Sequence, residues 1–401
     1  MSHAAPAVAP RGIAVLLAAL AAIGPFSIDT YLPSFHDIGQ SLGASPLQVQ
    51  QTLTAYLLPF AFMALWHGAL ADALGRRKVI LASLVLFVLA AFGCIFATSI
   101  EQIWVLRAIQ GASAGAGVVV SRAIVRDLFD GPAAQRLMSH ITMMFAIAPA
   151  IAPVIGGRLQ AWFGWRSVFV FLTAAIVLLL LACWRLLPET LPEKKRQSLH
   201  PGYLARSYWH VMTSPAFLAA CFGLSFNFAG FFLYVMSAPE FLIRHLGVPE
   251  TAFLWLFGPA MGGLLSGSWL SGKLAGRLSA SRTIRIGYLL MALAALGNLA
   301  LSLWVPASLP WSVLPIPLYT LGMSLTMPSL TLLALDPFPT RRGLAASCQM
   351  FLQSTFNSVL AGMLAPALWG STLTLALGMA GLLALGALAT ALHHRISRAP
   401  T

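Results

Sequence analysis

The sequence predicts an all-α membrane protein whose twelve spanning helices form two bundles of six. Three observations predict this fold class. Of the 401 residues, 59% are hydrophobic and only 9% are charged, which leaves too few charges to cover a water-soluble surface. Apolar stretches near the length of about 20 residues that a spanning helix needs recur along the whole chain. The least hydrophobic interval, 188–214, divides these stretches into six and six.

The predicted spans follow one another with short connections. The first span is expected to be a retained helix and not a signal peptide, because only Arg11 supplies positive charge before it and no convincing cleavage site follows. We expect a first six-helix bundle over 1–187, a cytoplasmic linker over 188–214 and a second six-helix bundle over 215–401. The spans are predicted near 12–33, 50–71, 79–98, 102–121, 137–157, 166–187, 215–238, 252–274, 283–304, 310–333, 343–365 and 370–392.

Positive charge is concentrated in the connections between spans. The formal net charge of +13 would suggest a nucleic-acid partner in a soluble protein, but no soluble basic patch with interleaved aromatic residues is present. Short loops rich in Lys and Arg face the cytoplasm, and most cations fall on one side of the predicted spans. The sequence therefore predicts a multi-pass membrane protein with both termini in the cytoplasm. The four cysteines lie inside apolar stretches without paired spacing, so we expect no metal site.

The connection from Gly68 to Lys78 has an ordered pattern of glycine, aspartate and arginine residues. It resembles the cytoplasmic loop signature of the major facilitator superfamily, and the alternative is a solvated loop held inside by its charge. Small glycines allow close helix approach, while acidic and basic side chains at this spacing can bridge neighbouring helices. We predict a cytoplasmic gate in which Asp72 and Arg76 make state-dependent contacts with residues such as Arg126 or with the eleventh span. The predicted gate residues are Gly68, Asp72, Gly75, Arg76, Arg77 and Arg126.

The fourth span carries an arginine inside an apolar stretch. An intramembrane Arg is costly, by about 2.5 kcal/mol or more, unless it faces a polar interior or an acid. Asp29 in the first span is the candidate partner of Arg107, because helix rise places both residues in the outer part of the membrane. The alternatives are an interfacial role for Asp29 and a purely structural role for Arg107. If the pair is functional, Asp29 binds and releases a proton during transport. We therefore expect the proton to be the coupling ion, and we expect no other cofactor.

The fifth span contains two prolines four residues apart, followed by two glycines: Pro149, Pro153, Gly156 and Gly157. This segment resembles the antiporter signature of drug exporters, with Ala152 where that pattern has Gly, and it predicts a kinked helix. Together with Asp29-Thr-Tyr-Leu-Pro33 and Leu187-Pro-Glu-Thr190, these motifs resemble the bicyclomycin-resistance (Bcr/CflA) branch of the drug:proton antiporters. The resemblance implies the major facilitator fold and export of small toxic molecules in exchange for protons.

Polar and aromatic residues at helical spacing are predicted to line a central substrate cavity. Polar side chains repeated along an apolar span face protein or water and not lipid. The alternative is hydrogen bonding between helices, or ordinary packing for the apolar members. The predicted lining is Tyr31, Tyr56, Gln110, Met144, Asn227, Phe231, Tyr234, Gln349, Gln353 and Asn357.

The sequence thus predicts a secondary transporter that exports small lipophilic or amphipathic molecules by proton antiport and alternating access. An importer of a specific metabolite with the same architecture is the alternative. A membrane enzyme is disfavoured because the spans show no set of nucleophile, base and acid, and a passive channel because the signatures imply two moving bundles. We expect a monomer in the bilayer, with protons and small molecules but no nucleic acid as partners.

Overall fold

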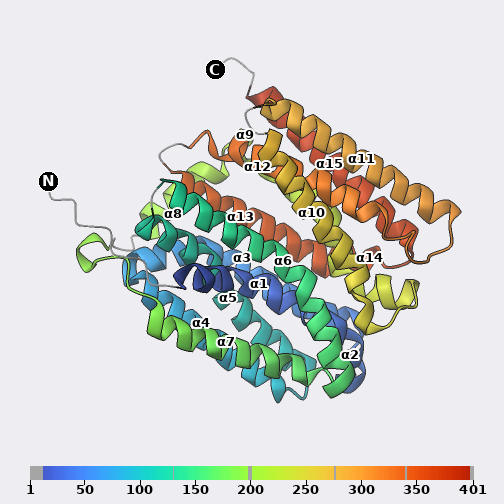
Figure 1. Ribbon diagram of the computed structural model, residues 1–401, viewed down its shortest axis with the longest axis horizontal. Coiled ribbons are helices and arrows are strands. Elements are labelled where there is room, and N and C mark those ends of the chain that lie inside the picture. The colour runs from blue at the N-terminus through green and yellow to red at the C-terminus, as the bar shows by residue number, and fades with distance from the viewer. Residues whose placement is uncertain (1–11, 130, 197–200, 275–276, 339–340, 398–401) are drawn as a thin grey trace.

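A computed structural model gives the structure of the chain. It describes residues 12–129, 131–196, 201–274, 277–338 and 341–397, without the side chains of 131–136, 139–140, 142–146, 195, 201 and 203–204. The regular elements in these ranges are helices. Figure 1 shows two groups of long helices side by side, one from the blue-to-green half of the chain and one from the yellow-to-red half. The all-α membrane fold predicted from composition is confirmed.

The first bundle and the segment after it contain α1 (Ile13–Asp29), η1 (Leu32–Ser34), α2 (Phe35–Leu42), α3 (Pro46–Leu74), α4 (Arg76–Ile95), α5 (Ile100–Leu128), α6 (Gly131–Phe163), α7 (Arg166–Leu186), η2 (Glu193–Lys195) and α8 (Pro201–Met212). The second bundle contains α9 (Pro215–Met236), η3 (Pro239–His245), η4 (Glu250–Ala252), α10 (Leu254–Leu274), α11 (Ala280–Trp304), α12 (Pro315–Leu335), α13 (Arg342–Val359), η5 (Leu360–Leu364), α14 (Ala365–Ala367) and α15 (Thr372–Ile396). We call the end of the molecule at the α3–α4 turn the basic end and the opposite end the neutral end.

Ten segments among the described residues are long and apolar enough to cross a membrane. The remaining two predicted spans correspond to α6 and α13, which run alongside them (Figure 1). Several helices exceed their predicted spans; α3, for example, covers Pro46–Leu74 where 50–71 was expected. Hydropathy detects only the part of a helix that fits the hydrocarbon, so the polar turns beyond it escape prediction. The short helices α2 and α8 escaped for the same reason.

Local sequence signals set where several helices begin. Ser45 and Gln48 form a capping box at the start of α3: the Ser45 hydroxyl accepts from the Gln48 N–H at 3.3 Å, and Gln48 Oε1 accepts from the Ser45 N–H at 2.8 Å. Pro46 follows at the first helical position, where its missing N–H costs nothing. Ser371 and Thr374 make the equivalent box at the start of α15. These caps satisfy backbone donors that a helix start leaves free.

The two bundles use the same pattern of helix neighbours. In the first bundle α3 packs on α5, α1 on α6 and α4 on α7, and in the second bundle α10 packs on α12, α9 on α13 and α11 on α15. The bundles meet through α3 against α13 and through α6 against α10. The sequence repeat was weak at the level of residue identity, but the packing shows two related halves that meet on two helix pairs.

Glycines of α5 allow the first bundle to pack closely. A Cβ at Gly111 would collide with the carbonyl oxygen of Tyr56 on α3, and a Cβ at Gly117 would collide with the carbonyl oxygen of Leu20 on α1. Without side chains at these positions, α5 approaches both neighbours at backbone distance. Small residues at such contacts stabilise membrane helix packing through van der Waals contact, because lipid offers no hydrophobic driving force.

We predict that Gly117→Ala destabilises the protein by about 1–3 kcal/mol, because the added methyl group must push α5 away from α1. The matched control is Gly297→Ala in α11, where nothing lies within 4 Å of the added Cβ. The midpoint of thermal unfolding in detergent micelles checks the difference. Equal midpoints for the two variants would contradict the proposed close contact.

Candidate functional site

Arg107 of α5 is completely buried in the first bundle, with 0% of its surface exposed. Its Nη1 donates to the Ser27 hydroxyl at 3.1 Å, to the Ser27 carbonyl at 3.4 Å and to Gln110 Oε1 at 2.8 Å. Ser27 lies near the neutral end of α1, and Gln110 lies three residues further along α5, on the same helical face as Arg107. Two helices therefore hold one side of the guanidinium.

Two tyrosine rings enclose the other faces of the guanidinium. The Arg107 Cζ lies 4.4 Å from the ring centroid of Tyr56 and 4.8 Å from that of Tyr31. Such distances allow a cation–π attraction that strengthens where water is excluded. The close approach of the Tyr56 backbone to Gly111 brings α3 near enough to place its ring here. We call Ser27, Tyr31, Tyr56, Arg107 and Gln110 the Arg107 cluster.

The Arg107 cluster contains several buried polar atoms without a hydrogen-bond partner. They are Arg107 Nε, Arg107 Nη2, Gln110 Nε2 and the hydroxyl oxygens of Tyr31 and Tyr56. All four of these side chains carry N–H or O–H groups that have no acceptor in this arrangement of the helices, and most buried polar groups in proteins are paired. These unpaired polar groups are gathered around one buried cation.

The predicted ion pair between Asp29 and Arg107 is not formed in this arrangement of the described residues. Asp29 is buried, with 3% of its surface exposed, and it forms no ion pair or hydrogen bond with any of the residues the structure describes. Ser27 and Tyr31 are four residues apart and both reach Arg107, whereas Asp29 lies two residues from each. Residues two apart on a helix point to different sides. Asp29 and Arg107 can therefore lie at a similar depth in the membrane without their side chains facing each other.

Helix α6 packs against the segment that carries Asp29. It runs through Pro149 and Pro153 as one helix, and its two glycines make contacts in opposite directions. A Cβ at Gly156 would collide with the carbonyl oxygen of Thr30, directly after Asp29. A Cβ at Gly157 would lie 2.5 Å from the carbonyl oxygen of Glu250 in the second bundle. The glycine pair thus contacts both the Asp29 segment and the opposite bundle.

The bundles are joined at the neutral end by hydrogen bonds across their interface. Gln50 Nε2 donates to the carbonyl oxygens of Met236 at 3.3 Å and Ala361 at 3.1 Å, and Gln51 Nε2 donates to that of Gly362 at 2.9 Å. These amides lie at the start of α3, and their acceptors lie at the ends of α9 and η5. The neutral end is therefore closed between the bundles.

A cavity of about 700 Å³ lies beside this closure and is lined by both bundles. Its first-bundle wall comes from α2 and the start of α3, and its second-bundle wall includes Glu240 and Arg244, which form an ion pair at 3.2 Å. Gln50 contributes to the lining, and its Oε1 is buried without a partner. The volume falls within the range of small-molecule sites.

At the basic end, the predicted gate residues form a network within the first bundle and the segment that follows it. Arg76 pairs with Asp72 at 2.6 Å and with Asp127 at 3.2 Å, and the Thr190 hydroxyl donates to Asp127 at 2.7 Å. Gly68 and Asp72 are on α3 and Arg76 is on α4, so the predicted loop is a turn at Gly75, whose φ is +104°. Only glycine adopts this backbone without strain.

In this arrangement Arg76 forms no ion pair or hydrogen bond with Arg126, and the state-dependent contact stays a prediction. Arg126 is exposed, and its neighbour Asp127 reaches Arg76 instead. Two cations repel each other, whereas the adjacent carboxylate offers the opposite charge. Arg77 donates through Nη2 to the carbonyl oxygen of Trp184 at 2.5 Å, which ties α4 to α7.

Glu189, which the sequence reasoning did not select as a site residue, caps the start of α4. Its Oε1 accepts from the Arg76 N–H at 2.9 Å and its Oε2 from the Arg77 N–H at 3.3 Å. A carboxylate at a helix N-terminus satisfies free donors and interacts favourably with the helix dipole. The signal that could have found it is the Leu187-Pro-Glu-Thr190 segment, which was recognised without a physical role.

Two of the predicted cavity residues in α9 instead serve the packing of the second bundle. Asn227 Nδ2 donates to the Tyr288 hydroxyl at 2.8 Å, and Asn298 Nδ2 donates to the Tyr234 hydroxyl at 2.6 Å; both partners lie on α11. Periodicity showed that Asn227, Phe231 and Tyr234 share a face, but it did not show which neighbour that face meets. The cavity assignment of Asn227 and Tyr234 is therefore corrected to hydrogen bonding between helices.

The remaining cavity predictions fall in different places. Tyr31, Tyr56 and Gln110 belong to the Arg107 cluster, and Phe231 is buried in α9. Gln349 and Gln353 are half-buried and Asn357 is buried on α13, the helix that meets α3 at the bundle interface. The Met144 side chain lies outside the described residues. The first-bundle members and α13 remain predicted lining positions.

Two bundles that meet on two helix pairs, with a buried polar cluster beside a closed end, define a membrane transporter. The chain belongs to the Major Facilitator Superfamily, whose family model matches residues 15–366.

Relatives place the chain near drug-resistance proteins. It is 32% identical over 270 residues to a bicyclomycin resistance protein homolog of Haemophilus influenzae, covering 67% of this chain and 68% of the relative. It is 27% identical to multidrug resistance protein D of Escherichia coli, covering 87% of each. A bacterial homolog of the human lysosomal transporter Spinster, solved in an inward-facing and unoccupied conformation, matches the fold with a TM-score of 0.71 at 16% identity over 96% of both chains. The resemblance to the bicyclomycin-resistance branch is confirmed.

We predict that Glu189→Gln lowers the stability of the protein by about 1 kcal/mol, because the amide loses the charge that favours the N-terminus of α4. The matched control is Glu193→Gln, whose side chain is 83% exposed and pairs only with Arg196 three residues away. Thermal unfolding in detergent micelles compares the two. A Glu193 variant as destabilised as the Glu189 variant would contradict a specific capping role.

Proposed function

We propose that the protein exports small amphipathic or lipophilic molecules across a bacterial inner membrane in exchange for protons. The observation that carries this proposal is the buried carboxylate of Asp29, which lacks a cationic partner among the described residues and lies next to the Arg107 cluster. A charged carboxylate without a partner is costly in a nonpolar interior. Binding and release of a proton at Asp29 therefore depend on which side of the membrane supplies water to it.

The contacts of α6 support coupling between Asp29 and the movement of the bundles. Gly156 contacts the residue after Asp29, and Gly157 contacts the second bundle. A displacement of α6 relative to η4 when the neutral end opens therefore reaches the Asp29 segment directly. This gives the proton site a physical connection to the closure of the transporter.

The Arg107 cluster supplies the second part of the proposed mechanism. In the closed arrangement Arg107 uses Ser27, Gln110 and two tyrosine rings, and two of its nitrogens have no acceptor. A rotation at the end of α1 that brings the Asp29 carboxylate to the Arg107 cluster would provide an acceptor for these nitrogens. The Asp29 proton would then leave as the charged pair forms, since an opposite charge favours the ionised carboxylate.

We propose that the basic end faces the cytoplasm, as the distribution of Lys and Arg predicts. The closed neutral end then faces outward, and the described arrangement is open, or ready to open, toward the cytoplasm. Substrate enters from the cytoplasm, the bundles rock, and substrate leaves past the 700 Å³ cavity as Asp29 takes up a proton. Return of the bundles releases that proton inside. The names of the drug-resistance relatives support the direction of transport.

We predict that Asp29→Asn abolishes transport driven by a pH gradient while the protein still folds, because the amide cannot exchange a proton. The measurement is uptake of a panel of dyes and antibiotics into sealed inverted vesicles with an imposed pH gradient. The control is Glu101→Gln, an exposed carboxylate at the start of α5. Undiminished gradient-driven transport by the Asp29 variant would overturn its role, and a wild-type protein that moves no compound against its gradient would overturn antiport.

We predict that a disulfide between Thr54→Cys and Gly362→Cys locks the neutral end and stops transport. A Cβ at Gly362 would lie 2.6 Å from Thr54 Oγ1 across the bundle interface, so the two positions are close enough to react. The double variant should lose transport under oxidation and recover it after reduction, while each single variant stays active. The four native cysteines are buried, which limits competing reactions. Full transport by the cross-linked protein would exclude alternating access through this end.

A further inference from the structure

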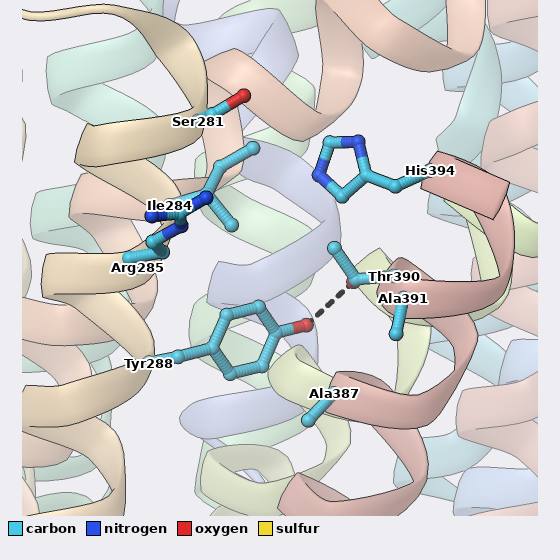
Figure 2. Close-up of a pocket in the computed structure, with 8 residues that line it drawn as sticks. All are labelled: Ser281, Ile284, Arg285, Tyr288, Ala387, Thr390, Ala391 and His394. Carbon is cyan, nitrogen blue, oxygen red and sulfur yellow. Dashed lines mark hydrogen bonds between the residues drawn. The ribbon is translucent and has the colours of Figure 1, made fainter. Parts of the chain in front are cut away.

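A groove of about 310 Å³ lies on the second bundle, between α11 and α15 and away from the bundle interface. Figure 2 shows Ser281, Arg285 and Tyr288 along α11 on one side and Ala387, Thr390 and His394 along α15 on the other. On each helix the lining residues are spaced at three and four positions, so each helix presents one face to the groove. The complete lining is Ser281, Ile284, Arg285, Tyr288, Ala387, Thr390, Ala391 and His394.

The shape of the groove comes from the residue sizes on its two walls. Ala387 and Ala391 leave space along α15, and Ile284 adds an apolar wall on α11. At the deeper end, the Tyr288 hydroxyl and the Thr390 hydroxyl are hydrogen bonded at 2.7 Å and close the groove. Ser281, Arg285 and His394 line the groove nearer the basic end than this hydroxyl pair.

Arg285 is the charged group of the groove, and the protein offers it no carboxylate. It forms no ion pair or hydrogen bond within the part of the chain that the structure describes. Neither α11 nor α15 contains an acidic residue, and the second half of the sequence has only three. Glu240 pairs with Arg244, Asp336 with Arg342, and Glu250 lies at the α6 contact near the neutral end.

The groove lies among exposed apolar side chains of a kind that suits contact with lipid. Leu289, Leu388 and Leu392 on the same two helices are large apolar side chains left exposed by the protein. Arg285 is five residues into α11, about 7.5 Å from its start by helix rise, so it lies in the first turns of a helix that is long and apolar enough to cross a membrane. An unpaired Arg at this position is stabilised by a phosphate, whose oxygens accept two parallel hydrogen bonds from the guanidinium.

We propose that this groove binds the phosphate headgroup of an anionic membrane phospholipid, with its acyl chain lying along the alanine face of α15. Basic pockets between membrane helices on the cytoplasmic side are suited to such headgroups. Arg285 supplies the charge, Ser281 a hydroxyl donor and His394 the facing polar wall. The site is remote from the Arg107 cluster and does not depend on the substrate of the transporter.

The test uses full-length protein purified in detergent and titrated with phosphatidylglycerol, with bound lipid counted by native mass spectrometry. Arg285→Gln should lower lipid affinity about five-fold, as expected for one cation at a membrane surface. Arg285→Lys should retain most of the affinity. Arg282→Gln is the matched control, because this exposed arginine of α11 is not part of the lining. Equal losses for Arg285→Gln and Arg282→Gln would overturn the site.

Additional variants and ligands distinguish a phospholipid from other ligands and separate a loss of binding from misfolding. Ala391→Leu fills the groove at an exposed position, so it should weaken lipid binding with Arg285 intact and unfolding temperature unchanged. Diacylglycerol, which lacks phosphate, should bind weakly to every variant. Tight diacylglycerol binding would overturn phosphate recognition. An increase in unfolding temperature by inorganic phosphate alone that depends on Arg285 would show a free-anion site and overturn the lipid assignment.

Discussion

The burial of one guanidinium organises the first bundle. Arg107 has no exposed surface in an apolar helix bundle, so every neighbour must either accept a hydrogen bond or present an aromatic face. That requirement is met by Ser27 near the end of α1, by Tyr31 just beyond it, and by Tyr56 of α3, which approaches α5 closely at Gly111. It also turns Asp29 away from the cation. The geometry of the proposed proton site is thus a consequence of how the cation is accommodated.

Sequence reasoning predicted the helical membrane fold because hydrocarbon thickness imposes a length and composition that hydropathy measures directly. It also selected residues that the structure brings together, since Arg107, Gln110, Tyr31 and Tyr56 all lie in one cluster. The prediction failed where the role of a residue depends on which helix its side chain packs against. The period of α9 showed a polar face but not that Asn227 would meet Tyr288.

Charge patterns were informative about location and less informative about partners. The motif around Arg76 contains one of its partners, Asp72, but not Asp127, which also pairs with Arg76. It also lacks Glu189, which accepts from the backbone N–H groups of Arg76 and Arg77 from far along the chain. Carboxylates at such distances are invisible to local spacing rules. The one-residue turn at Gly75 also escaped prediction, because a polar segment can equally be a loop or two helix ends.

Gly157 of α6 gives the bundle interface an unusual energetic character. Its contact with the Glu250 segment of the second bundle is made by backbone against backbone, so no side-chain rotamer of Gly157 is immobilised when the bundles close and none is released when they part. The entropy of side chains therefore contributes little to the equilibrium at this contact. The equilibrium between the closed and the open neutral end then depends on nearby polar groups, such as the Gln50 and Gln51 amides. Water can replace the hydrogen bonds of these amides at small cost in free energy.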